Sequence, residues 1–168
     1  MSTRLPPRPP KYDHFNVPRF AIVASEYNPE FVQGLVNNAC KELYNLEERS
    51  AIELFNAPGS FEIPVVAEMV ASLQRHDVII ALGLVLQGKT RHAELIAESV
   101  ANALQQVALK HATPVIHEVL LVGTEEEARE RCLGKDLNRG TEAARAAFSV
   151  LRTKQQMQNS TAKRPPIR

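Results

Sequence analysis

Tryptophan is absent from this chain of 168 residues, and aromatic residues make up only 5% of it. Proteins that bind single-stranded nucleic acid usually stack the bases on aromatic side chains. The formal net charge is only +1 at neutral pH, which gives little electrostatic attraction to a polyanion. We therefore predict that neither nucleic acid nor a membrane surface is a partner of this protein.

Cysteine and long apolar runs are also scarce. The two cysteines, Cys40 and Cys132, are too few for a disulfide framework or a zinc cluster, and we interpret both as reduced, small hydrophobic residues. The histidines show no metal-ligand spacing, so the sequence indicates no metal site. The longest apolar run, residues 78–86, is far shorter than the roughly 20 residues that span a bilayer. Residues 1–10 lack the apolar segment of a secretory signal, so we expect a cytoplasmic protein.

The length of the chain suits one folded domain with a sizeable core. Four prolines between residues 6 and 10 predict that residues 1–17 form an arm, either disordered or extended along a neighbour. Residues 153–168 are polar and basic, which is typical of a solvated tail. The single domain should therefore cover residues 18–152.

Within that domain, apolar strands alternate with amphipathic helices. Strands are predicted at residues 19–25, 51–55, 78–86 and 114–122. Helical apolar stripes cover residues 31–43, 63–73, 96–107 and 143–151, and Thr124 begins a capping box that opens a further short helix. Continuous apolar strands in this alternation predict a four-stranded parallel sheet with helices on both faces, a flavodoxin-like three-layer α/β/α sandwich with an N-terminal arm.

Residues 83–90 (GLVLQGKT) fit the pattern of a nucleotide-binding P-loop, and we predict that the match is false. A P-loop needs an open loop between its glycines so that backbone N–H groups can surround a phosphate. Here Leu84 to Gln87 continue the apolar run that begins at Val78, so Gly83 should lie inside a strand. What remains is a short turn, Gly88-Lys89-Thr90, before a helix that begins near His92.

That turn is still a candidate anion site, because a helix N-terminus offers free N–H groups and a positive dipole end. Thr90 and Lys89 could each contact a phosphate, although Thr90 could instead be an N-cap and Lys89 a solvated charge. His92 lies at the mouth of the turn and is a competent general acid or base near neutral pH. The combination indicates chemistry on a small phosphorylated metabolite rather than nucleotide hydrolysis.

Other candidates follow the strands, at the sheet edge where ligands bind in such folds. Tyr27 could cover this edge or stack on a planar ligand. Glu62 lies at a helix start, where a carboxylate is also favourable for structural reasons. Arg131 is more simply explained as an i,i+4 partner of Glu127. His117 lies in an apolar strand, where a satisfied core histidine is the usual outcome.

Four segments, in this order, resemble those of the 6,7-dimethyl-8-ribityllumazine synthases. They are residues 19–28 (RFAIVASEYN), 57–64 (APGSFEIP), 81–92 (ALGLVLQGKTRH) and 130–140 (ERCLGKDLNRG). The resemblance implies an enzyme of riboflavin biosynthesis that joins a ribitylamino-pyrimidinedione to 3,4-dihydroxy-2-butanone 4-phosphate, releases phosphate and water, and uses no cofactor or metal. It implies that His92 is the acid/base residue.

The resemblance also implies a set of substrate-binding positions: Tyr27, Asn28, Ser60, Phe61, Glu62, Leu84, Val85, Leu86, Lys89, Thr90, His117, Arg131 and Lys135. Within this set, Tyr27 matches an aromatic ring that stacks on the pyrimidine, and residues 60–62 match those that hold the ribityl chain. Residues 84–86 match a strand whose backbone binds the heterocycle. Thr90 and Arg131 match phosphate-holding positions.

Several residues depart from the family pattern. Gln87 stands where Lys or Arg is usual, Lys89 where a small or acidic residue is usual, and His117 where many members have a Phe that acts across a subunit interface. The resemblance implies a homo-oligomer, either a pentamer or a sixty-subunit shell of pentamers, with active sites between subunits. Residues 133–138 keep the family's length, which favours a shell, but they lose some glycines, so a free pentamer or another assembly such as a decamer stays open.

Three alternatives compete with this interpretation. An archaeal-type riboflavin synthase would share the fold but use no phosphorylated substrate. A nucleotide switch would need an Asp at a strand end, where residues 120–123 read Leu-Leu-Val-Gly. A catalytically weakened binding or shell-forming homologue would account for Gln87, Lys89 and His117.

Overall fold

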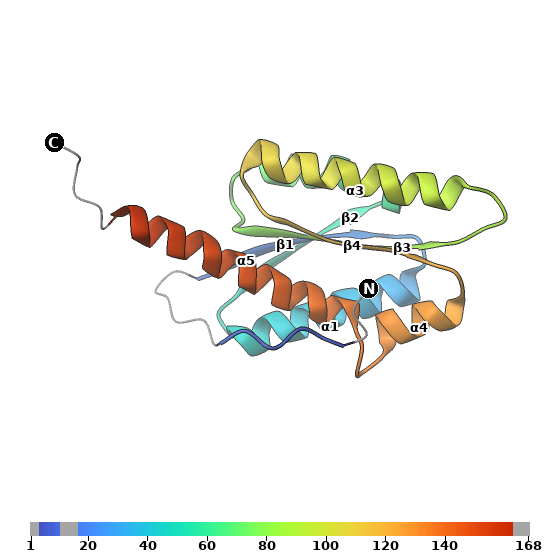
Figure 1. Ribbon diagram of the computed structural model, residues 1–168, viewed down its shortest axis with the longest axis horizontal. Helices are drawn as coiled ribbons and strands as arrows, with labels where there is room; N and C mark the ends of the chain where they lie inside the picture. Colours follow the sequence, from blue (N-terminus) through green and yellow to red (C-terminus); the bar gives the residue numbers. More distant parts are fainter. Residues whose placement is uncertain (1–3, 11–16, 163–168) are drawn as a thin grey trace.

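A computed structural model of the protein describes residues 4–10 and 17–162 (Figure 1). The elements follow in the order β1 (Arg19–Ser25), α1 (Pro29–Leu46), β2 (Ala51–Ala57), the 3-10 turn η1 (Ser60–Glu62), α2 (Ile63–Ser72), β3 (Val78–Leu86), α3 (His92–His111), β4 (Val115–Val122), α4 (Glu125–Leu133) and α5 (Arg139–Ala162). The predicted alternation of strands and helices is confirmed.

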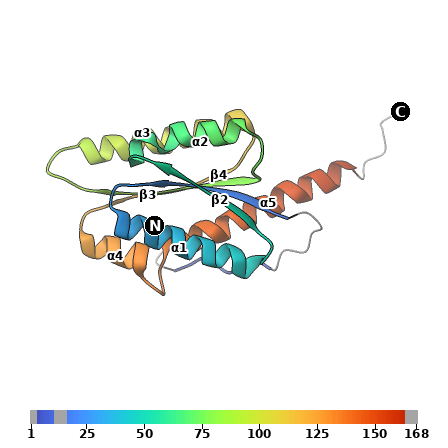
Figure 2. The ribbon, with the colours of Figure 1, turned by 180° about the vertical axis from the view of Figure 1, so that it is seen from behind.

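The four strands form one parallel sheet in the order β2-β1-β3-β4. Helices α2 and α3 cover one face, and α1, α4 and α5 cover the other, as the two opposite views show (Figures 1 and 2). The predicted flavodoxin-like three-layer fold is therefore confirmed. The chain leaves β1 toward β2 and then returns to β3, so the sheet has its topological switch point between β1 and β3, which is where such folds bind ligands.

Two apolar layers sandwich the sheet, and this explains why its central strands are apolar without interruption. Phe20, Ile22 and Leu82 belong to the layer that contains α1 and α5, whereas Val23 and Ala81 belong to the layer under α2 and α3. All five side chains are fully buried. Alternate residues of one strand thus point into opposite layers, and both layers exclude water.

Gly83 lies inside β3, in register with Val119 of β4. This confirms the prediction that the P-loop match is false. A Cβ at this position would lie 2.9 Å from Ser60 Oγ and 3.0 Å from Ile63 Cδ1. These distances are too short for a non-bonded carbon. The glycine is therefore explained by the close packing of η1 and α2 on β3.

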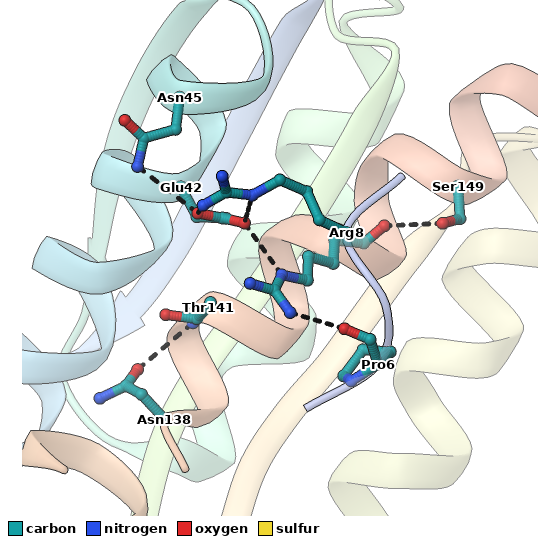
Figure 3. Close-up of polar contacts among 8 residues, drawn as sticks. Pro6, Arg8, Glu42, Asn45, Asn138, Thr141 and Ser149 are labelled. Carbon is teal, nitrogen blue, oxygen red and sulfur yellow. Dashed lines mark hydrogen bonds and ion pairs between the residues drawn. The ribbon is translucent and has the colours of Figure 1, made fainter. Parts of the chain in front are cut away.

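Residues 4–10 of the N-terminal arm lie along α1 and α5 of the same chain (Figure 3). Arg8 donates from Nε and Nη2 to the two carboxylate oxygens of Glu42, each at 2.9 Å, and Arg145 Nε donates to the same carboxylate at 2.9 Å. Arg145 Nη1 also donates to the carbonyl of Pro6 at 2.6 Å. Burial raises the pKa of Glu42, but the two guanidinium groups outweigh it and hold the pKa below its ordinary value.

Helix α5 runs from Arg139 to Ala162. It therefore extends past residue 152, where the boundary between the domain and the C-terminal tail was predicted. A polar composition indicates exposure, and residues 156–158 are indeed exposed, but it does not exclude a helix. Residues 1–3, 11–16 and 163–168, which belong to the predicted arm and tail, lie outside the described residues. No helix among residues 4–10 and 17–162 is long and apolar enough to cross a membrane.

Candidate active site

A cavity of about 430 Å³ opens at the carboxyl ends of β1 and β3, at the switch point of the sheet. Its walls come from the β1–α1 turn, η1, the end of β3 and the start of α3. The lining residues are Tyr27, Asn28, Gly59, Ser60, Phe61, Glu62, Leu84, Val85, Leu86, His92 and Ile96. The structure thus brings together His92 and most of the predicted substrate-binding positions, from four segments far apart in sequence.

The β1–α1 turn contributes an exposed aromatic ring and an amide. Tyr27 is 72% exposed, so its ring is available to a planar ligand. Asn28 occupies the N-cap position of α1, and Pro29 lies in the first turn. The Asn28 side chain does not cap the helix but donates from Nδ2 to the carbonyl oxygen of Leu84 at 3.0 Å.

The η1 turn contributes polar and apolar groups side by side. Ser60 is buried, and its Oγ has no hydrogen-bond partner among the described residues. Phe61 is 56% exposed. Glu62 occupies the N-cap position of α2, yet its carboxylate makes no capping hydrogen bond to α2, which is described in full. A carboxylate that the helix does not use can accept hydrogen bonds from hydroxyl groups of a ligand.

His92 is the first residue of α3 and is exposed. It also lines a second cavity of about 580 Å³, together with Leu95 and Ser99 of the same helix. Phe61, Glu62, His92 and Ile96 line both cavities.

The Gly88-Lys89-Thr90 turn lies beside His92 but outside the lining of the first cavity, and all three residues are exposed. Helix α3 begins at His92 with Arg91 at the N-cap position, so the alternative interpretation of Thr90 as N-cap is wrong. Within one chain, residues 88–90 therefore form an exposed rim beside the cavity, and this segment is called the rim below.

Arg131 and Lys135 lie away from the cavity, on α4 and in the loop that follows it. Thr124 Oγ1 accepts a hydrogen bond from the amide of Glu127 at 3.2 Å, which confirms the predicted N-terminal cap of α4. Arg131 Nη1 is 3.4 Å from Glu127 Oε2, so the predicted i,i+4 pairing is also confirmed. Because α4 belongs to the layer opposite α3, one chain does not join these cations to His92 (Figure 1).

The interpretation of His117 as a satisfied core histidine is wrong. His117 is exposed on β4, an outer strand that pairs only with β3 in the described sheet. The apolar sequence around it did not reveal that β4 is at the edge. Although the side chain is exposed, it is still partly desolvated, and this lowers the pKa of His117 from its ordinary value.

Sequence reasoning missed a second titratable residue on the same strand. Glu118 points into the opposite layer, where burial and the nearby Glu142 carboxylate raise its pKa from 4.5 to about 7, although Arg139 opposes this. Arg139 pairs with Glu142 in the first turn of α5. A carboxylate within the mostly apolar residues 115–122 was the available signal. The sequence did not reveal the second carboxylate.

Gly59 and Ile96 also line the cavity and were not predicted, although Gly59 belongs to the APGSFEIP segment. Both cysteines are free thiols, as expected. In the part of the chain that the structure describes, no three His, Cys, Asp or Glu side chains lie close enough together to hold a metal ion.

Comparison with known proteins supports the resemblance found in the sequence. The family model for 6,7-dimethyl-8-ribityllumazine synthase matches residues 17–155. The chain is 34% identical over 143 residues to the 6,7-dimethyl-8-ribityllumazine synthase of Leuconostoc mesenteroides, covering 84% of this chain and 91% of that protein.

Two further relatives carry the same name. Identity is 41% over 134 residues with the protein of Xanthomonas oryzae pv. oryzae (strain PXO99A) and 37% over 134 residues with that of Xylella fastidiosa (strain 9a5c). In each case the match covers 79% of this chain and 87% of the relative. The fold, the cavity at the switch point and these matches agree, and the chain therefore belongs to the 6,7-dimethyl-8-ribityllumazine synthase family.

Proposed function

We propose that this protein condenses 5-amino-6-(D-ribitylamino)uracil with 3,4-dihydroxy-2-butanone 4-phosphate to 6,7-dimethyl-8-ribityllumazine, with release of phosphate and water, in the cytoplasm. The observation that supports this most strongly is the cavity at the switch point, which is lined by an exposed aromatic ring, a carboxylate that does not cap its own helix and a histidine at a helix N-terminus. Those groups suit a planar heterocycle with a polyhydroxylated chain and a reaction that needs proton transfer.

The pyrimidine substrate occupies the first cavity. Its ring stacks on Tyr27, whose exposed face offers apolar contact without a fixed polar partner. The backbone of residues 84–86 borders the same space and supplies hydrogen bonds to the heterocycle. Residues 60–62 hold the ribityl hydroxyl groups, and the Glu62 carboxylate is a strong acceptor for them.

His92 serves the proton transfers of the condensation. The 5-amino group attacks the ketone carbon, and loss of water from the adduct gives a Schiff base. Removal of a proton from the carbon chain and departure of phosphate then generate an enol, and attack of the second nitrogen on the resulting carbonyl closes the ring with loss of a second water. Proximity of the two substrates and a positioned acid/base side chain suffice for such steps.

We further propose that a second copy of the chain completes the phosphate end of the site. The Gly88-Lys89-Thr90 rim beside His92 is exposed, while Arg131 and Lys135 lie on a different part of the molecule. His117 is likewise exposed on an edge strand. Juxtaposing the β4 and α4 side of one copy with the rim of another brings these groups to the phosphate, in a pentamer or a sixty-subunit shell of pentamers.

The activity is tested by mixing both substrates with purified protein in the presence of EDTA and following lumazine absorbance. We expect product well above the uncatalysed background. Absence of acceleration by folded protein would refute the proposal. Incubation with lumazine alone is the control for a riboflavin synthase, because dismutation of lumazine would yield riboflavin without phosphate.

The shared site is tested by complementation. His92→Ala and Arg131→Ala proteins are each expected to be weakly active. After they are unfolded together and refolded, mixed oligomers contain some sites with both native residues, so activity should rise above that of either variant treated alone. Activity that does not rise, although mixed oligomers are detected by mass spectrometry, would contradict a site shared between copies.

A further inference from the structure

Asn28 adopts a left-handed backbone conformation between β1 and α1. Its φ is 56° and its ψ is 54°, a region that non-glycine residues seldom occupy but that asparagine tolerates comparatively well. Its carbonyl oxygen accepts hydrogen bonds from the amides of Phe31 and Val32, both at 3.1 Å. The sharp turn at Asn28 therefore both starts the helix and sets the direction in which the preceding residue, Tyr27, leaves the sheet.

The side chain of Asn28 does something unusual for its position. A helix-start asparagine commonly accepts a hydrogen bond from the first helical amides. In α1, every residue of which is described, no such bond is present. The Asn28 Nδ2 instead donates to the carbonyl oxygen of Leu84, 56 residues later in the sequence, at 3.0 Å. This hydrogen bond ties the turn that carries Tyr27 to the end of β3, so it joins two walls of the cavity.

The Tyr27 ring has a second support at Gly59. A Cβ at Gly59 would lie 3.3 Å from Cδ2 and 3.7 Å from Cε2 of the ring, and 2.9 Å from Glu62 Oε2. The ring therefore lies against the bare backbone of the turn before η1. Because Tyr27 is 72% exposed, few other contacts restrict it. Its orientation depends on the turn at Asn28 and on the space left by Gly59.

We propose that Asn28 is a positioning residue that sets the orientation of the Tyr27 ring for the pyrimidine substrate through its hydrogen bond to Leu84. This inference rests on the proposed condensation and changes the role expected for Asn28 from direct substrate contact to support of the ring. Loss of the hydrogen bond frees the turn from β3, and an already exposed ring then samples more orientations. Pyrimidine binding weakens, whereas binding of the butanone phosphate at the other end changes little.

Two substitutions separate the hydrogen bond from the backbone conformation. Asn28→Gly keeps access to the left-handed region but removes the amide. Asn28→Asp keeps the side-chain shape but presents an acceptor, which cannot donate to the Leu84 carbonyl. For both we expect the KM for the pyrimidine to rise roughly tenfold, as for a lost hydrogen bond, with little change in the KM for the butanone phosphate. Asn28→Gly should melt close to wild type.

A double-mutant cycle with Tyr27→Ala distinguishes positioning from direct contact. If Asn28 acts through the ring, Asn28→Gly adds little further loss once the ring is gone. A full loss that persists in the Tyr27→Ala background would show direct contact with the substrate and overturn the inference. A lower Tm with unchanged KM would do the same, because it would leave only a structural role. Wild-type protein that makes no lumazine would instead refute the proposed condensation.

Discussion

The half-buried acid Glu118 leads to a quantitative prediction about stability and pH. Burial and the Glu142 carboxylate raise its pKa from 4.5 to about 7 in the folded protein. Because the folded pKa lies above the unfolded one, the folded state binds the proton more tightly. The stabilisation by that proton is fully present below pH 4.5 and is lost as the pH rises through about 7. Its full size is about 3 kcal/mol, of which about 2 kcal/mol is lost between about pH 5.5 and 8.5.

Glu118→Gln mimics the protonated acid at every pH. We therefore expect the substitution to increase the free energy of unfolding, relative to wild type, by about 2 kcal/mol more at about pH 8.5 than at about pH 5.5. The measurement is urea unfolding at both pH values and one fixed protein concentration, because oligomerisation makes apparent stability concentration-dependent. Glu98→Gln, at an exposed position on α3, is the matched control. If Glu118→Gln changed the free energy of unfolding by the same amount at both pH values, the reasoning would be refuted.

Three further substitutions test other parts of the structure. His92→Ala should lower kcat by roughly a hundredfold or more without changing the oligomer size in light scattering, and unchanged turnover would remove His92 from its acid/base role. Arg131→Ala should raise the KM for the butanone phosphate by roughly tenfold but barely affect that for the pyrimidine, and equal effects on both would place Arg131 elsewhere. Gly83→Ala should cost about 1–3 kcal/mol of stability because its Cβ meets Ser60 and Ile63, and an unchanged unfolding curve would contradict that packing.

The sheet and its helices could be predicted from the sequence because local patterns determine them. The apolar run from Val78 to Leu86 is long enough to identify a strand buried on both faces, and it placed Gly83 inside that strand. The capping box at Thr124 identified the start of α4. Proline at residue 29 marked the first turn of α1. Each of these signals lies within a few residues of the feature that it predicts.

Features that depend on distant partners could not be predicted in this way. The hydrogen bond from Asn28 to Leu84 and the ion pair between Arg8 and Glu42 each join segments that are far apart in sequence. The capping preference of asparagine even pointed to a different bond for Asn28. For His117, an apolar run of residues did not distinguish an edge strand from a central one.

The candidate site was also predictable only where local patterns determine it. The rule that ligands bind at the carboxyl ends of parallel strands located the cavity, and the segments around Tyr27, Ser60 and His92 do meet there. The sequence did not indicate that Arg131 and Lys135 lie in the layer opposite α3. That separation follows from the order of the elements around the sheet, and it is the reason for proposing that a second copy completes the site.

The most direct test of the central claim is to measure lumazine and inorganic phosphate in the same sample, with both substrates, EDTA and the wild-type protein. The proposed condensation predicts that the two products form together, one phosphate for each lumazine, well above the uncatalysed background. Phosphate release without lumazine, or no acceleration of either product by the folded oligomer, would contradict it.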